Sequence, residues 1–143
     1  MKEKTLDYIL RATWQAVARM YNEEASKFNG SMAIGFALLS IDKEEGTPST
    51  KISSRMGMEA TSLTRTLKAL EEKGLITRQK NPEDGRGVLI FLTDFGKEMR
   101  AQSKETVLKF NESIRKKISE EKLKNFIEVT EIINDLIAEK KIF

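Results

Sequence analysis

The stretch that most constrains this chain runs from residue 49 to 92, where two short helical patterns lead directly into two short strand patterns. The first helical pattern covers residues 49–56 and stops at Gly57; the second covers 60–74 and stops at Gly74. Glycine often ends a helix because it adopts the left-handed conformation without steric cost. Two helices joined by a turn of about three or four residues predict a helix-turn-helix.

A β-hairpin is predicted immediately after this helix pair. Residues 75–80 and 88–92 are typical of strands, and the loop between them, 81–87, is rich in the turn formers Asn, Pro, Asp and Gly. A helix-turn-helix followed by a hairpin is the arrangement of a winged helix. The sequence therefore predicts a mainly α-helical fold with a small β-hairpin wing.

Long helices are predicted on both sides of this region. Residues 5–28 form one helix with a single apolar stripe, and residues 32–41 are apolar nearly all round, which is typical of a helix buried in the centre of a domain. Helix resumes after Thr93, a suitable N-cap, with a break near 118–122. The apolar surface of the last helix is wide for a chain end, so we expect the terminal helices to pair with a second subunit. The alternative is that they fold back onto their own core.

Composition excludes several classes of function. The 143 residues suit one domain, and they include neither cysteine nor histidine. Disulfides, Cys/His zinc sites, thiol nucleophiles and imidazole acid–base chemistry are therefore excluded, and no metal or catalytic residue is expected. Adjacent glutamate pairs, such as Glu23–Glu24, point about 100° apart on a helix and do not converge on one site. The chain is predicted not to be an enzyme. Without an apolar leader or spanning segment, a cytoplasmic protein with no membrane partner is expected.

The middle of the chain carries the basic excess. Residues 47–97 hold nine Lys/Arg and six Asp/Glu, whereas 1–46 hold six and seven, and 98–143 hold ten and nine. A basic surface over the predicted winged helix suits a nucleic-acid partner.

Candidate DNA contacts follow from the helix-turn-helix. Its second helix enters the major groove and should carry polar donors and acceptors, with cations, opposite its leucines. The residues predicted for this role are Thr61, Ser62, Thr64, Arg65 and Lys68. The preceding helix offers three predicted contacts to the phosphate backbone: Ser53, Ser54 and Arg55. The alternative is that the hydroxyls only solubilise an exposed helix start.

The hairpin loop adds a second predicted contact. A hairpin beside a major-groove helix reaches toward the adjacent minor groove, whose narrow, electronegative A·T-rich form favours an inserted arginine. Arg86 suits that task, and Asp84 can hold its guanidinium or the turn amides. The alternative is a simple turn with a solvated arginine.

At this point the chain resembles the MarR family of bacterial transcriptional regulators over nearly its whole length. The resemblance is carried by the wing, where an Asp-x-Arg pair is followed by Leu-Thr-x-x-Gly, and by the segment "ATSLTRTLKALEEKGLITR". The wing residues at the family's spacings are Asp84, Arg86, Leu92, Thr93 and Gly96.

The resemblance implies a single domain over 1–143, with residues 32–97 as the DNA-binding lobe. The helices of 1–30 and 98–143 would intertwine into a triangular homodimer. It implies binding to double-stranded DNA at a palindromic operator, and repression of a promoter. Many members release DNA when a small molecule binds, while others sense oxidants through a cysteine, which this chain lacks.

An effector pocket is predicted from the first two helices, and no other cofactor is expected. An arginine beside aromatic and thioether surface suits an anionic aromatic or acyl compound. The residues concerned are Arg11, Trp14, Met32 and Phe36, for which ordinary core packing is the alternative. Two other functions remain open: a winged helix used only for protein contacts, and a transcriptional activator of the same fold.

Overall fold

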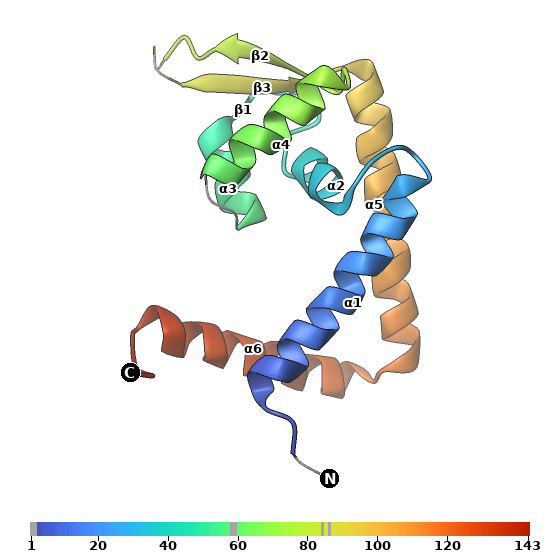
Figure 1. Ribbon diagram of the computed structural model, residues 1–143, viewed down its shortest axis with the longest axis vertical. Helices are drawn as coiled ribbons and strands as arrows, with labels where there is room; N and C mark the ends of the chain where they lie inside the picture. The colour runs from blue at the N-terminus through green and yellow to red at the C-terminus, as the bar shows by residue number, and fades with distance from the viewer. Residues whose placement is uncertain (1–2, 58–59, 84, 86) are drawn as a thin grey trace. The chain divides into compact units, whose positions relative to one another are not determined.

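The structure is a computed structural model in which residues 3–57, 60–83, 85 and 87–143 are described (Figure 1). It divides into two compact units, Met1–Glu105 and Thr106–Phe143. The predicted fold class is confirmed: the chain is mainly helical, with a small antiparallel sheet.

Among its described residues, the first unit contains four complete helices and the sheet. The helices are α1 (Leu6–Ser26), α2 (Met32–Leu39), α3 (Ser49–Met56) and α4 (Ala60–Glu72). α1 ends in a turn where Asn29 takes a positive φ of 58°. Ser31 caps α2 by accepting a hydrogen bond from the amide of Ile34, and Gly57 caps α3 in the left-handed conformation. The predicted stop at Gly57 is therefore confirmed.

The sheet has three strands, one more than the sequence predicts. β2 (Ile76–Lys80) and β3 (Val88–Leu92) form the expected hairpin, with Ile76 opposite Leu92. β1 (Thr47–Pro48) adds to the other edge of β3, so that β3 lies in the centre. Because β1 has only two residues and its partner strand is about 40 positions away, no local pattern reveals it.

The core of the first unit lies where α2, α3 and α4 meet the sheet. Its members come from each of these elements, and the most completely buried of them are Ala37, Leu38, Ile41, Ile52, Leu70 and Ile90. α1 joins this unit through its C-terminal half, where the ring of Tyr21 meets Phe36 edge-on at 5.5 Å. Toward its N-terminal end the apolar stripe of α1 is exposed: Trp14 is 54% accessible.

Helix α5 (Asp94–Lys117) begins against the base of the hairpin. The Thr93 hydroxyl accepts a hydrogen bond from the amide of Gly96 and donates one to the carbonyl of Gly74. Gly96 is buried, and a β-carbon there would collide with the carbonyl oxygen of Leu75. The Leu-Thr-x-x-Gly pattern thus joins the end of α4, the hairpin and α5, and the predicted N-cap is confirmed.

The second unit contains the end of α5 and helix α6 (Glu120–Ala138). Ser119 separates the two helices and caps α6 by accepting from the amide of Lys122. Much of the apolar surface of α6 is exposed, namely Phe126, Ile127, Val129, Ile132, Leu136 and Ile137.

Two features are absent from the described residues. None of their helices combines the length and apolar character that a membrane span requires. They also contain no group of three or more acidic side chains placed to hold a metal ion.

Candidate nucleic-acid interface

Helix α4 has one buried face and one exposed polar face. Leu63, Leu67 and Leu70 are at most 4% accessible and belong to the core. On the other side the helix exposes four of the predicted contact residues: Ser62, Thr64, Arg65 and Lys68. Thr61 lies in α4, but its side chain is outside the described residues. We call Ser62, Thr64, Arg65 and Lys68 the polar face of α4.

The C-terminal end of α4 is fixed from two directions. The ammonium of Lys73 donates a hydrogen bond to the carbonyl of Asn29 at 3.0 Å, next to the end of α1. Glu71 forms an ion pair with Arg78 of β2 at 3.2 Å. The helix that presents the polar face is therefore attached both to α1 and to the hairpin.

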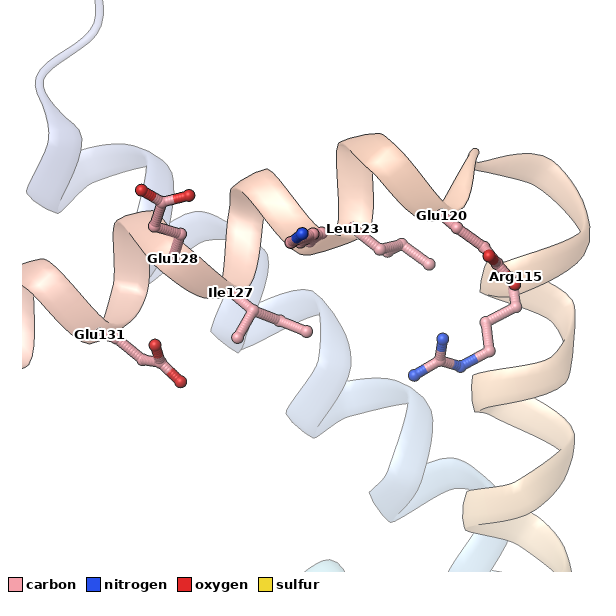
Figure 2. A pocket seen from close by; sticks show the side chains of 7 residues that line it. Arg115, Glu120, Leu123, Ile127, Glu128 and Glu131 are labelled. Carbon is pink, nitrogen blue, oxygen red and sulfur yellow. The ribbon is translucent and has the colours of Figure 1, made fainter.

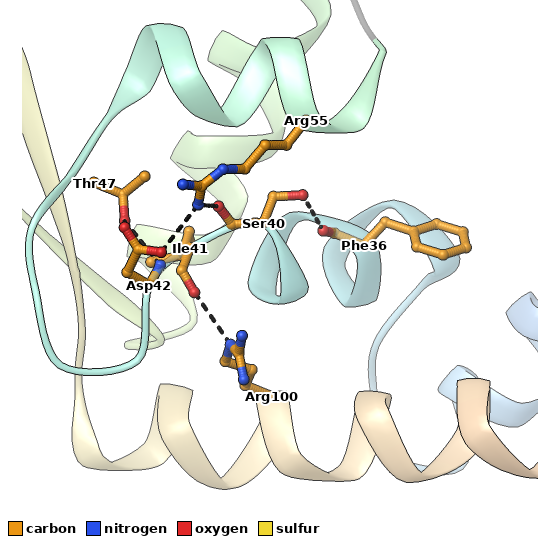
Figure 3. Close-up of polar contacts among 7 residues, drawn as sticks. All are labelled: Phe36, Ser40, Ile41, Asp42, Thr47, Arg55 and Arg100. Carbon is orange, nitrogen blue, oxygen red and sulfur yellow. Dashed lines mark hydrogen bonds and ion pairs between the residues drawn. The ribbon is translucent and has the colours of Figure 1, made fainter.

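Helix α3 carries the three residues predicted for the phosphate backbone. Ser54 is exposed, whereas Ser53 is half-buried and donates its hydroxyl to the carbonyl of Thr50 at 2.9 Å. The side chain of Arg55 turns toward the end of α2 and stays partly exposed. Its Nη1 donates to the carbonyl of Ser40 at 2.8 Å and lies 3.1 Å from Oδ1 of Asp42 (Figure 3).

Asp42 is the centre of this polar cluster. Its Oδ2 accepts a hydrogen bond from the hydroxyl of the buried Thr47, and its own amide donates to the same hydroxyl. The hydrogen bond from Arg55 lowers the pKa of Asp42, with help from Thr47 and the nearby Lys51. The carboxylate is thus held ionised between α3 and β1.

The wing is described at its base. The amide of Asn81 donates to the carbonyl of Gly87, which closes the hairpin, and the side chain of Asn81 accepts from the amide of Glu83. The predicted contacts Asp84 and Arg86 lie outside the described residues.

A small cleft of about 170 Å³ adjoins the polar face. It lies among α3, α4 and the sheet, and its polar lining includes Ser49, Thr50, Ser53, Thr64 and Arg78. The sequence patterns assign no role in DNA binding to Ser49, Thr50 or Arg78. The sequence places Arg78 in the first predicted strand. Its position beside α4 becomes visible only in the structure, through its ion pair with Glu71.

The four residues predicted for an effector pocket differ in their exposure to solvent. Arg11 and Trp14 are exposed on α1, and Arg11 pairs with Asp7 on the next turn at 3.6 Å. Met32 and Phe36 are half-buried on α2, where the amide of Met32 donates to the side chain of Asn22. None of the four lines the cleft beside α4.

A second, larger groove of about 520 Å³ lies within the second unit. Figure 2 shows the guanidinium of Arg115, near the end of α5, pointing toward the same space as Leu123 and Ile127 of α6. Glu120, Glu128 and Glu131 also line it. This groove combines apolar side chains with charges of both signs. Such a lining suits contact with another protein surface better than binding of a small ligand with one charge.

Comparison with known proteins gives a consistent result. Residues 31–88 match the model of the MarR family. The HTH-type transcriptional regulator BilQ of Clostridioides difficile strain CD3 is 25% identical over 137 residues, covering 95% of this chain and 92% of its own.

Two solved structures share the fold over nearly the whole chain. The S. aureus MepR–DNA complex has a TM-score of 0.85 at 20% identity, covering 94% of this chain and 100% of the other. The PcaV transcriptional regulator from Streptomyces coelicolor, in complex with its natural ligand, has a TM-score of 0.79 at 19% identity, covering 94% and 98%. Together with the helices and the hairpin described above, these matches identify residues 31–88 as a MarR-family segment, in a chain that shares the winged helix-turn-helix fold of MarR-family transcriptional regulators over nearly its whole length.

Proposed function

We propose that this chain is a homodimeric, sequence-specific DNA-binding repressor that a small molecule releases from a palindromic operator. The observation that carries the proposal is the polar face of α4, which stands opposite three buried leucines. A helix of about 10–12 Å diameter fits the major groove. The related fold of MepR, solved as a complex with DNA, supports the same use of this lobe.

Each part of the proposed interface has a different task. In the polar face, Arg65 can donate two hydrogen bonds to a guanine edge, and the hydroxyls of Ser62 and Thr64 suit bases or phosphates. Lys68 of the polar face is a further candidate for a phosphate contact, and Thr61 is proposed as an additional contact. Ser53 and Ser54 of α3 face the phosphate backbone in this proposal, and Arg86, steadied by Asp84, enters the minor groove.

Dimerisation is supported by apolar surface that the single chain leaves exposed. In the first unit, α1 exposes Leu6 and Trp14; in the second, α6 exposes Phe126, Val129 and Ile132. Burying such residues against a second copy removes apolar area from water, which favours association. A two-fold dimer presents the reading helix twice, so its operator should be an inverted repeat.

The proposal also includes release of the protein from DNA when a small molecule binds. PcaV, which shares this fold, was solved with its natural ligand. In this chain the proposed effector is an anionic aromatic or acyl compound held by Arg11 and Trp14 of α1 with Met32 and Phe36 of α2. Repression follows if the operator overlaps a promoter, because bound protein then excludes the polymerase.

Selection from a random duplex library tests the proposal. At about 0.15 M salt, where non-specific attraction is weakened, we expect enrichment of an inverted repeat with half-sites about one helical turn apart. Binding without enrichment, at an affinity that only falls with salt, would contradict sequence-specific regulation.

A further inference from the structure

Arg55 occupies a place that suits a phosphate contact, yet its guanidinium is already bound to Ser40 and Asp42 at the surface of the lobe. We propose that Arg55 is a positioning residue: by joining the last turn of α3 to the end of α2, it sets the angle at which α3 and α4 meet DNA. This inference rests on the proposed function, because it concerns how the same interface is held.

The contacts of Arg55 suit a structural link. Ser40 is the C-cap of α2, and the last carbonyls of a helix lack partners within the helix. A cation at this end also interacts favourably with the helix dipole. Nη1 of Arg55 supplies both the donor and the charge, at 2.8 Å from the Ser40 carbonyl.

The link extends beyond α3. Asp42 connects Arg55 to Thr47, which is fully buried in β1 and paired with Ile90 in the centre of the sheet. From the opposite side, Nε of Arg100 in α5 donates to the carbonyl of Ile41 at 3.1 Å (Figure 3). Two arginines from different helices thus hold consecutive carbonyls of the segment between α2 and β1. We call residues 40–42 with Arg55 and Arg100 the arginine clamp.

Electrostatics argue against a phosphate contact at Arg55. The carboxylate of Asp42, 3.1 Å away, already compensates the charge of the guanidinium. A phosphate close enough to bind Arg55 would also lie near this carboxylate, and like charges repel. A phosphate contact at Arg55 would therefore be weakened by the neighbouring carboxylate.

The position of α3 matters because only three residues separate the end of α3 from the start of α4. Ile52 anchors α3 in the core at 0% accessibility, and Leu63 and Leu67 of α4 belong to the same cluster. Met56, in the last turn of α3, also packs against this cluster. These apolar contacts hold one face of a short helix but do not fix its angle. The clamp adds directed polar contacts at the last turn, so its loss should reorient the helix pair while the core residues stay in place.

The test compares Arg55→Ala and Asp42→Asn for binding to the selected operator and to a random duplex, by fluorescence anisotropy over a range of salt. We expect each change to weaken operator binding by about three- to tenfold. Affinity for the random duplex and the salt slope should stay those of the parent. The double variant should bind no more weakly than Arg55→Ala alone, because both changes break one link.

A phosphate contact predicts the opposite pattern. Arg55→Ala would then lower the salt slope by about one unit, and affinity would fall equally for both duplexes. Asp42→Asn, which removes a negative charge beside the DNA, would leave binding unchanged or strengthen it. Lys43→Ala is the matched control, because it removes an exposed cation next to Asp42.

Two further readouts separate these outcomes from misfolding and from failure of the proposed function. Asp42→Asn keeps the shape of the side chain, so it carries the test if Arg55→Ala does not fold. Amide exchange in the free protein should accelerate at Asp42, whose amide is bound to Thr47. If the parent protein selects no operator, both proposals are overturned. If the parent selects an operator and both variants bind it with the parent's affinity, only the role of Arg55 is overturned.

Discussion

At the scale of single residues, Asp42 shows how one side chain couples charge to structure. Its pKa is lowered mainly by the hydrogen bond from Arg55, and Lys51 adds a weaker attraction. A lowered folded-state pKa means that the carboxylate stabilises the fold above its unfolded pKa of about 3.9. That contribution is lost as pH falls through the folded-state pKa.

The acid dependence of stability tests this coupling. Asp42→Asn should lower the free energy of unfolding at pH 7 by less than about 1 kcal/mol, because the pair is roughly half exposed. The difference from the parent should shrink as pH is lowered toward about 3, near the unfolded-state pKa. Urea unfolding at several pH values measures it, and a difference that stays constant with pH would contradict the ionised link.

Close packing around Gly96 leaves no room for a side chain. Since a β-carbon there would collide with the carbonyl of Leu75, Gly96→Ala should lower the free energy of unfolding by about 1–3 kcal/mol. Thermal unfolding measures this loss. Gly30→Ala is the control, because its β-carbon would meet the carbonyl of Ala25 at 3.4 Å, an ordinary contact. Equal stability of both variants would show that the start of α5 can move away from the hairpin.

At the scale of elements, Thr93 joins three parts of the first unit. Thr93→Val keeps the shape of the side chain but removes the cap on Gly96 and the donor to Gly74. Loss of a helix cap costs about 0.5–2 kcal/mol, and the second hydrogen bond adds to it. Chemical denaturation should therefore show a loss of about 1–3 kcal/mol. Thr13→Val, on an exposed turn of α1, should stay within about 0.5 kcal/mol of the parent.

Most elements could be predicted from local patterns. The helices α3 and α4, the stops at Gly57 and Gly74, and both hairpin strands lie within a few residues of the predicted positions. Each of these features depends on periodicity, glycine or turn chemistry within a short window of sequence.

Features that depend on distant partners could not be predicted. β1 is a strand only because Thr47 and Pro48 meet β3. Arg55 looks like a surface cation in sequence, since Ser40 and Asp42 precede it by 15 and 13 positions and no periodicity connects them. The exposure of the polar face of α4, in contrast, followed from its leucine spacing.

At the scale of the whole molecule, the proposed function depends on association of two chains. Ile132→Glu places a charge among apolar residues of α6 that are exposed in the single chain. If those residues form the dimer surface, the variant should be a monomer at concentrations where the parent is a dimer. Sedimentation equilibrium measures the mass. Asp135→Asn on the same helix should leave it unchanged, and a dimeric Ile132→Glu would place the interface elsewhere.

The central proposal is that α4 recognises bases of the operator. The most direct test is to measure the affinity of Arg65→Ala and of the parent for a set of operators, each changed at one base pair. Lys116→Ala, an exposed cation in the second unit, is the control. We expect a loss of about 1–3 kcal/mol in binding free energy, with relaxed base preference at one position in each half-site, the two positions being related by two-fold symmetry. An equal loss on all sequences, with a salt slope reduced by about one unit, would show that Arg65 holds a phosphate instead.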